Sequence, residues 1–324
     1  MGGVHMFEHH QTYQRTFREG ELTLGLHIPL ENYKMEKPTM ARQIELAQAA
    51  ETYGFTTLWL RDVILEDPNF GDPAVGQIYD ILIYGTHLLS QTKQIALGTS
   101  ALVLPLRHPL RLSKEVATIE ALFPERLIMG VSSGDRRADF KGLGIDHPSR
   151  GDQFREALSY LEKVLYESFP SIDSRYGHIE QATLVPKLMQ KIPTMITGFA
   201  QQDLDWIGMN GDGWIYYPQA PRRQLDAINA WRESASRQNQ SAFRPFSMPM
   251  HLDLAEDPDE HATPIRLGFR IGRNKLVELL KLYKTIGVNH LFFALFDSLR
   301  PADQVIHELG EYVLPHFPPH EINA

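Results

Sequence analysis

The chain has 324 residues, of which 43% are hydrophobic, a formal net charge of −8 and no cysteine. This composition supports one large core and excludes disulfides, thiolate metal sites and a cysteine nucleophile. It argues against nucleic acid as a partner, because no long Lys/Arg run is present to neutralise phosphates. With no apolar stretch of about 18 residues and no apolar signal core, we expect a cytoplasmic protein without a membrane span. The histidine spacings match no metal motif, so we expect no metal.

Strand-like and helix-like stretches alternate along the chain. The expected strands are the apolar or alternating runs at 22–30, 56–62, 94–105, 126–131, 191–198, 212–217, 246–256 and 289–297. The expected helices, which carry apolar residues at helical spacing, are 40–55, 79–92, 112–123, 152–167, 202–210, 222–237, 274–287 and 302–314. We expect one domain over 1–324, in which residues 1–20 form a mobile or peripheral N-terminal extension.

Eight strand–helix units in a chain of this length predict an α/β fold of the (β/α)₈ TIM-barrel type. Longer segments follow strand four (131–150) and strand seven (257–273), and we expect both to be insertions. An open doubly wound sheet is the alternative, which is disfavoured because no GxGxxG follows the first strand. The ligand site of a TIM barrel lies at the carboxyl ends of its strands, so the candidate residues are those that follow each strand.

Small and hydroxyl side chains gather at three of these strand ends, at 98–101, 132–135 and 197–201. Small residues let a ligand approach the backbone, and free N–H groups bind phosphate. Aromatic side chains such as Trp214, Tyr216 and Tyr217 supply walls. A flat ring system with a phosphate tail suits such a mouth, although glycine and serine are also ordinary turn formers after a strand.

Three segments resemble the luciferase-like flavin-dependent monooxygenase family, also called the bacterial luciferase superfamily. They are IALGTSALVLPLRHPLRLSKEVATIEALFPERLIMGVSSGDRRADFKGLG (95–144), GFTTLWLRD (54–62) and IPTMITGFAQQDLDWIGMNGDGWI (192–215). The resemblance covers about residues 20–300. It implies a TIM barrel that binds FMN or, in some lineages, the deazaflavin F420. It also implies a homodimer formed through the helices at 79–92 and 112–123, and allows a separate flavin reductase as a partner.

The same resemblance implies which residues contact the cofactor. They are Ser132, Ser133, Gly134, Asp135 and Arg136 after strand four, Gly198, Phe199, Ala200 and Gln201 after strand five, Ser100 and Ala101 behind the ring, joined by a cis peptide bond, and Trp214. Relatives carry Gly-Gly-Ser-Ser after strand five. Because this chain has Thr197–Gly198–Phe199–Ala200, the phosphate would rely there on the backbone N–H groups of residues 199–201.

Proton transfer cannot follow luciferase, because Val63 stands where luciferase has its catalytic histidine. We expect His27, at the end of the first strand, to be the first candidate for proton delivery, and Asp62 to be the second catalytic candidate. His251, at the end of strand seven, has a comparable position. Either histidine can also be a hydrogen-bonded structural residue.

The sequence therefore predicts a flavin-dependent oxidoreductase, in particular a monooxygenase that uses reduced FMN and O₂ on a small, partly apolar organic substrate. An F420-dependent oxidoreductase and a non-catalytic flavin-binding barrel are alternatives. A TIM-barrel hydrolase would use Glu31, Asp62, Asp253 or Asp297, and it is disfavoured because nothing in the sequence pairs these carboxylates.

Overall fold

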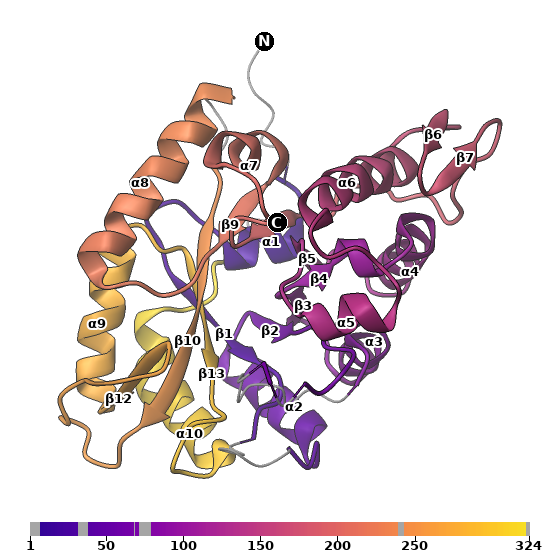
Figure 1. The fold of residues 1–324 in the computed structure, drawn as a ribbon. Coiled ribbons are helices and arrows are strands. Elements are labelled where there is room, and N and C mark those ends of the chain that lie inside the picture. Colours follow the sequence, from indigo (N-terminus) through magenta and orange to yellow (C-terminus); the bar gives the residue numbers. More distant parts are fainter. Residues whose placement is uncertain (1–6, 32–37, 68, 71–78, 239–242, 322–324) are drawn as a thin grey trace.

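The computed structural model describes residues 7–31, 38–67, 69–70, 79–238 and 243–321 (Figure 1). Parallel strands form a closed barrel, in which each strand pairs with the next along the chain and the last pairs with the first. They are β1 (Thr23–His27), β2 (Thr57–Leu60), β3 (Ala96–Thr99), β5 (Leu127–Ser132), β8 (Thr194–Thr197), β9 (Gly213–Ile215), β10 (Phe246–Leu254) and β13 (His290–Ala294). The predicted (β/α)₈ barrel is confirmed.

Helices cover the outside of the barrel, at the places that the apolar spacing predicted. They are α2 (Gln43–Tyr53), α3 (Ile81–Gln91), α4 (Pro109–Leu122), α6 (Arg150–Tyr166), α7 (Leu204–Asn210), α8 (Pro221–Gln238), α9 (Arg273–Thr285) and α10 (Ala302–Glu308). Local sequence sets their ends. Asp80 accepts the N–H groups of Leu82 and Ile83 at the start of α3, and Gly54 ends α2 with a φ of 99°. Among the described residues, no helix is both long and apolar enough to span a membrane.

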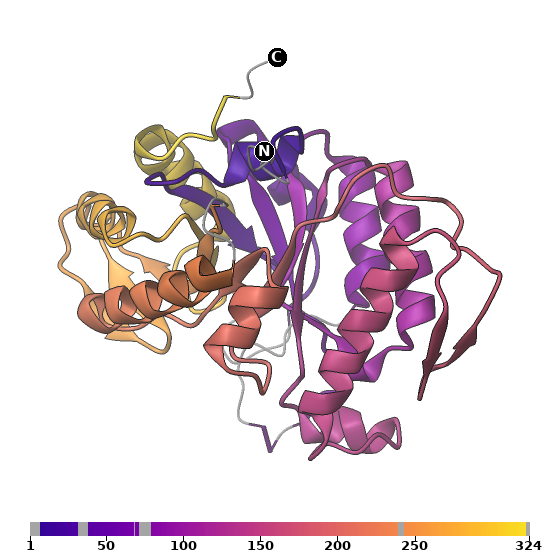
Figure 2. The ribbon, with the colours of Figure 1, turned by 90° about the horizontal axis from the view of Figure 1, so that it is seen from above.

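The insertions expected after strands four and seven are present. The first contains the short helix α5 (Arg137–Gly142). The second forms a hairpin of β11 (Thr263–Ile265) and β12 (Gly268–Ile271), and β12 pairs with the end of β10. A further hairpin, β6 (Ile172–Ser174) with β7 (Gly177–Ile179), projects from the barrel beyond α6 (Figures 1 and 2). The sequence did not predict this hairpin, because its strands are too short to show an alternating pattern.

The N-terminal segment packs against one end of the barrel from residue 7 onward, where we expected a mobile or peripheral extension. It contains α1 (Gln11–Thr16), and Phe7, Tyr13 and Phe17 are buried in a cluster with barrel residues that include Trp59 and Phe292. Residues 1–6 lie outside the described residues. The expectation of a mobile or peripheral extension rested on the many polar residues of this segment. Its aromatic residues are well separated in sequence, and they meet because the barrel end offers apolar surface.

A buried polar network centred on His290 lies inside the barrel. Its Nε2 accepts from Trp59 Nε1 at 3.0 Å and lies 2.8 Å from Thr57 Oγ1, and its Nδ1 lies 2.9 Å from Thr23 Oγ1. Burial lowers the pKa of His290 to about 3, so the ring is neutral at pH 7. Because Nε2 accepts from Trp59, we place the proton of the neutral ring on Nδ1. Gly25 leaves the space for this network, because a Cβ there would lie 2.2 Å from Thr57 Oγ1.

We predict that Gly25→Ala lowers the free energy of unfolding by about 1–3 kcal/mol, since the added methyl overpacks a rigid interior. Urea unfolding measures the change. Ser236→Ala on the exposed face of α8 is the control and is expected to change stability by less than about 0.5 kcal/mol. Equal stability of Gly25→Ala and the control would contradict this packing argument.

Candidate active site

A pocket of about 710 Å³ opens at the carboxyl ends of the barrel strands, a size typical of small-molecule sites. It gathers residues from strand ends that lie far apart in the sequence. The predicted residues that line it are His27, Asp62, Ser100, Ala101, Ser132, Ser133, Gly134, Asp135, Arg136, Gly198, Phe199, Ala200 and Gln201. The peptide bond between Ser100 and Ala101 is cis, as predicted.

Trp214 does not line the pocket, contrary to the sequence-based expectation. Its side chain is buried behind the wall, where its Nε1 donates to the Gly198 carbonyl at 2.7 Å and its ring stacks on Tyr216 at 4.6 Å. Side chains alternate along β9, and Ile215 lines the pocket in its place. Trp214 therefore supports the wall, and Tyr216 faces the cavity.

Gly130 in β5 and Gly134 just after it stand at positions where neighbouring protein atoms leave no room for a side chain. A Cβ on Gly130 would lie 2.0 Å from the Thr99 carbonyl oxygen. A Cβ on Gly134, which has a φ of 77°, would lie 2.5 Å from Val103 Cγ1. Close packing against β3 and the following β4 (Leu102–Val103) thus explains both residues without a ligand. The neighbouring Ser132 and Ser133 are the small side chains that line the pocket.

Arg136 holds the far side of the same loop. Its Nη2 donates to the Leu65 carbonyl at 2.7 Å, its Nε lies 3.4 Å from Asp139 Oδ2, and its guanidinium lies 4.6 Å from the centre of the Phe70 ring. Its Nη1 is buried without a hydrogen-bond partner among the described residues, although the side chain lines the pocket. A buried donor without a partner is costly, so an acceptor in the pocket would stabilise it.

The loop after β8 exposes backbone to the pocket. Gly198, Ala200 and Gln201 have φ values of 61°, 49° and 61°, and a Cβ on Gly198 would meet nothing within 4 Å. The N–H of Gly198 donates to the Ile215 carbonyl at 2.8 Å, so it is not available to a ligand. At the start of the loop, Thr197 Oγ1 is a buried hydroxyl without a partner among the described residues.

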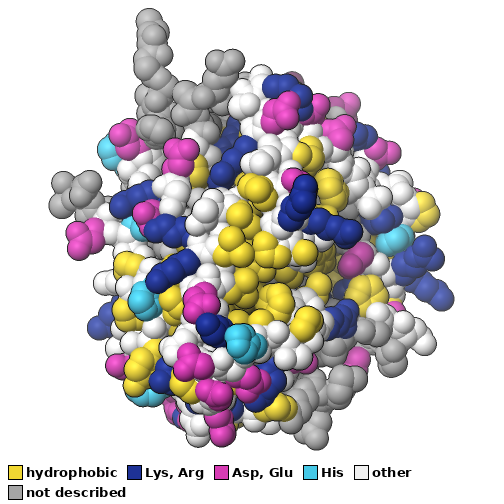
Figure 3. All heavy atoms as spheres, turned by 90° about the vertical axis from the view of Figure 1, so that its left-hand side faces the viewer, with side chains coloured by type: hydrophobic (Ala, Val, Ile, Leu, Met, Phe, Trp, Pro, Cys, Tyr) yellow, Lys and Arg dark blue, Asp and Glu magenta, His cyan; other side chains and the backbone are white. Residues whose placement is uncertain are grey.

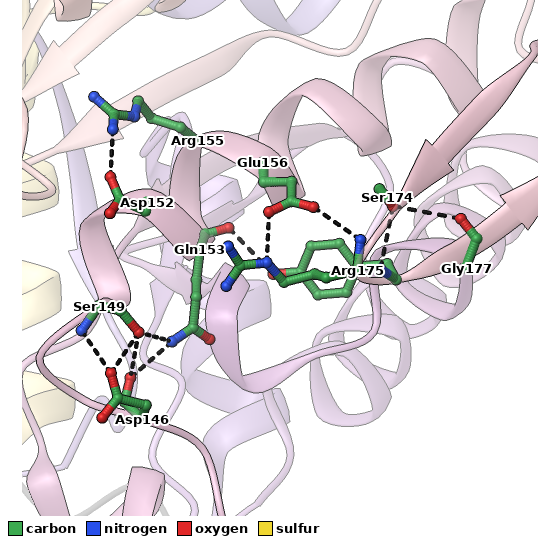
Figure 4. Close-up of polar contacts among 10 residues, drawn as sticks. Asp146, Ser149, Asp152, Gln153, Arg155, Glu156, Ser174, Arg175 and Gly177 are labelled. Carbon is green, nitrogen blue, oxygen red and sulfur yellow. Dashed lines mark hydrogen bonds and ion pairs between the residues drawn. The ribbon is translucent and has the colours of Figure 1, made fainter.

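Helix α6 begins between these two loops and ties them together. Arg150 Nε donates to the Gly134 carbonyl at 2.9 Å, and Gln202 Nε2 donates to the Gly151 carbonyl at 3.0 Å. The start of the helix is fastened by Ser149, whose N–H donates to Asp146 Oδ2 at 3.0 Å (Figure 4). A helix start with an adjacent arginine attracts anions. The sequence analysis missed Arg150, for which the only signal was its place at the start of a helix that follows the insertion.

Asp62 lines the pocket, but its carboxylate is engaged by Arg107. Arg107 donates from Nε at 3.1 Å and from Nη2 at 2.9 Å, and the N–H of Val103 donates at 3.2 Å. Burial acts to lower the pKa of Arg107, but hydrogen bonds and charge from Asp62 and Asp80 outweigh it and raise the pKa. Asp62 thus fixes the loop after β3, and its carboxylate is already engaged there.

Two histidines line the pocket from neighbouring parts of the barrel. The ring of His27 lies parallel to Phe292, with 6.2 Å between ring centres. His251 Nδ1 lies 3.3 Å from Asp297 Oδ2, and its ring packs against Phe296 in a T-shaped arrangement with 4.3 Å between ring centres. Both side chains are buried and combine an apolar contact with access to the cavity, an arrangement that suits proton transfer or the binding of a polar atom.

The other carboxylates proposed for a hydrolase have structural partners. Asp253 accepts from Arg270 Nη1 at 2.8 Å and from the N–H of Leu299 at 2.9 Å. Glu31 accepts from the N–H of Met40 at 2.6 Å and does not line the pocket. Of the four carboxylates considered for a hydrolase, Asp62 alone lines the described pocket, and Arg107 binds it, which disfavours the hydrolase alternative.

Comparison with known proteins identifies the class to which this barrel and pocket belong. Residues 22–270 match the family model described as luciferase-like monooxygenase. The match covers most of the chain, which therefore belongs to this family of monooxygenases and oxidoreductases. Flavin-dependent and F420-dependent enzymes are among the similar proteins.

Particular relatives show the range of this family. The chain is 25% identical over 201 residues to the alkanal monooxygenase alpha chain of the Kryptophanaron alfredi symbiont, a match that covers 60% of this chain and 54% of that protein. The chain spans about half the length of the curated relatives that it matches first.

Two solved structures share the fold. An F420-dependent secondary alcohol dehydrogenase, in complex with an F420–acetone adduct, matches with a TM-score of 0.74 and 18% identity, over 94% of this chain and 100% of that one. The oxygenating constituent of 3,6-diketocamphane monooxygenase from Pseudomonas putida, in complex with FMN, matches with a TM-score of 0.72 and 14% identity, over 91% and 98%.

We predict that Asp62→Asn lowers the free energy of unfolding by about 1.5–3 kcal/mol, because it weakens the charged hydrogen bonds of a largely buried Arg107, which keeps Asp80 as its second partner. Asp303→Asn, which breaks an exposed pair with Arg42, is the matched control and is expected to have little effect in urea. If Asp62→Asn were as stable as the wild type and lost only turnover, Asp62 would belong to the chemistry after all.

Proposed function

We propose that the chain is a flavin-dependent oxidoreductase, in particular a monooxygenase that uses reduced FMN and O₂ on a small, partly apolar organic substrate. The observation that carries the proposal is the convergence of two backbone loops, the start of α6 and two arginines on one side of an aromatic-walled pocket. FMN, when bound and reduced, supplies the electrons for the reduction of O₂.

The pocket residues fit the phosphate of such a cofactor. The N–H groups of Phe199, Ala200 and Gln201 donate to no other described residue, and left-handed residues in such a loop turn N–H groups toward an anion. Arg150 reaches this position from the start of α6, where its hydrogen bonds are to the Gly134 and His147 carbonyls. Within the described part of the chain, no hydrogen-bonded carboxylate compensates its charge. Arg136 Nη1 and Thr197 Oγ1, which have no hydrogen-bond partner among the described residues, would add further contacts.

The remaining pocket residues would hold the ring and keep the reaction dry. Ser100, Ala101 and Ser132 place backbone and small side chains where a flat ring can lie. Val63 and Phe296 supply apolar surface that excludes water, and water hastens the unproductive decay of reduced flavin with O₂. His27 lies at the pocket floor as the proposed proton donor.

An F420-dependent oxidoreductase is the second candidate, since the solved relative with the F420–acetone adduct shares the fold. F420 also carries a flat ring and a phosphate, so the same loops suit it. A non-catalytic flavin-binding barrel is the third. Titration with FMN and F420 separates the first two, and O₂ consumption with a flavin reductase as partner separates the third.

We predict that Gly198→Asp weakens FMN binding at least tenfold, equivalent to about 1.4 kcal/mol, because it adds negative charge beside the phosphate. Isothermal titration with FMN and with F420 measures it. Gly144→Asp is the matched control, because Gly144 also has a positive φ and open space at its Cβ but lies outside the pocket. Equal FMN affinity of Gly198→Asp and wild type would move the phosphate elsewhere.

We propose further that the chain forms a homodimer through α3 and α4. Leu82, Leu89 and Leu112 on these helices are buried within the single chain, so they cannot supply the interface. Exposed Ile83 and Leu122 on these helices remain as candidates. The opposite face, on the side of α8 and α9, also gathers apolar side chains at its centre, with charged side chains around them (Figure 3).

Light scattering at micromolar concentration decides between these faces. We expect a dimer for the wild type, a monomer for Ile83→Glu combined with Leu122→Glu, and a dimer for Leu282→Glu on α9, whose side chain is also exposed. A monomeric wild type, or dissociation caused by Leu282→Glu alone, would refute the proposed interface.

A further inference from the structure

We propose that the pocket holds a subsite for one neutral carbonyl or hydroxyl oxygen of the substrate, located above Ala294 and between the imidazoles of His27 and His251. Asp297 is the positioning residue of His251. The inference deepens the proposed function and rests on it only in taking this pocket as the substrate site.

Strand register places the three residues at one level of the barrel. In β13, Phe293 faces Leu26 of β1, so Ala294 is level with His27. On the other side of β13, Ala294 faces His251 of β10. Residues at one level of neighbouring parallel strands point to the same side of the sheet, and all three line the pocket. With strands about 4.8 Å apart, the two histidine Cα atoms are roughly 10 Å apart, with only a methyl group between them.

The imidazole of His251 is held from several directions. Asp297 Oδ2 lies 3.3 Å from the buried Nδ1, within ion-pair reach although not aligned for a hydrogen bond. A T-shaped contact with Phe296, with 4.3 Å between ring centres and 73° between ring planes, fixes the tilt of the His251 ring. The N–H of His251 donates to the Leu267 carbonyl at 3.0 Å, and Gly268 approaches so closely that a Cβ would lie 1.8 Å from the His251 carbonyl oxygen. With Nδ1 toward Asp297, Nε2 is the nitrogen left for the cavity.

His27 is supported from below by an aromatic column. Its ring lies parallel to Phe292, within 13°, and Phe292 stacks on Trp59 at 4.6 Å. Both Phe292 and Trp59 are buried in the barrel interior. The two imidazoles therefore rest on different rigid supports, and the gap between them is defined by the small size of Ala294.

The chemistry of this gap selects the ligand class. An imidazole donates at one ring nitrogen and accepts at the other. A substrate hydroxyl between the two rings can therefore donate to one ring and accept from the other, and a carbonyl oxygen can accept from the ring that presents its N–H. The carboxylate of Asp297 behind His251 disfavours an anionic substrate group at the same place. Pro249 and Phe296 line the adjoining wall, which suits an apolar body attached to that oxygen.

Ring-labelled histidine NMR of the whole protein, with and without FMN, tests the subsite. The probes are cyclohexanone, cyclohexanol and cyclohexanecarboxylate. We expect the two neutral probes to shift the ring signals of His27 and His251 along one saturation curve, and the carboxylate to bind at least tenfold more weakly. His108 caps α4 outside the pocket and serves as the internal reference. No saturable shift, or a shift of one pocket histidine alone, would overturn the proposal.

Variants separate this subsite from the cofactor site. Ala294→Leu fills the gap and is expected to lower the affinity for the neutral probes at least tenfold, with FMN affinity unchanged. The control, Ala230→Leu on the exposed side of α8, is expected to change neither affinity. Ala294→Val gives the same direction if the leucine variant does not fold. Unchanged probe binding in a folded Ala294 variant refutes the subsite. If the wild type does not bind FMN but still shows the probe-induced histidine shifts, the proposed cofactor is refuted instead.

Asp297 is tested as a positioning residue through the response of each histidine. Asp297→Asn is expected to reduce the probe-induced shift of His251 and to leave that of His27, and Asp297→Glu is expected to restore part of it. An equal loss at both histidines would indicate a general disturbance of the pocket, and no loss at either would remove Asp297 from the subsite.

Discussion

Closure of the barrel by the pairing of β13 with β1 is the constraint on which the site depends. Because all strands of the ring are parallel, closure brings every carboxyl end to one rim. Residues as distant in sequence as His27 and Phe296 then share one cavity. Each loop in turn is stabilised locally: Arg107 holds the loop after β3, and the start of α6 holds the loops after β5 and β8.

The interior beneath the rim is built to be rigid. Trp59, Phe292 and His290 fill the barrel because Gly25 and Gly98 leave room for them. A neutral His290, bonded on both ring nitrogens, fixes the polar part of this filling. The pocket floor thus rests on a packed layer that the pocket residues themselves do not have to organise.

The sequence predicted the barrel because each strand and helix has a strong periodic pattern, and it predicted most of the pocket because strand ends can be read from those patterns. It could not reveal Arg150, Arg266 or Leu267, which reach the pocket from an insertion border and a hairpin tip. Their positions depend on tertiary contacts. The prediction that Trp214 lines the pocket was wrong for a related reason, because a residue in the wall and the residue behind it differ by one position in the strand. Gly130 and Gly134 suggested a ligand, although crowding by Thr99 and Val103 explains them.

The aromatic side chains of the N-terminal segment cover the end of the barrel opposite the rim. With that end covered, molecules reach the described pocket from the rim. A cofactor, O₂ and an organic substrate would therefore share one route, and whichever lies deepest must arrive first and leave last. The packed interior and the N-terminal segment beneath it would thereby set an order of arrival and departure for the ligands.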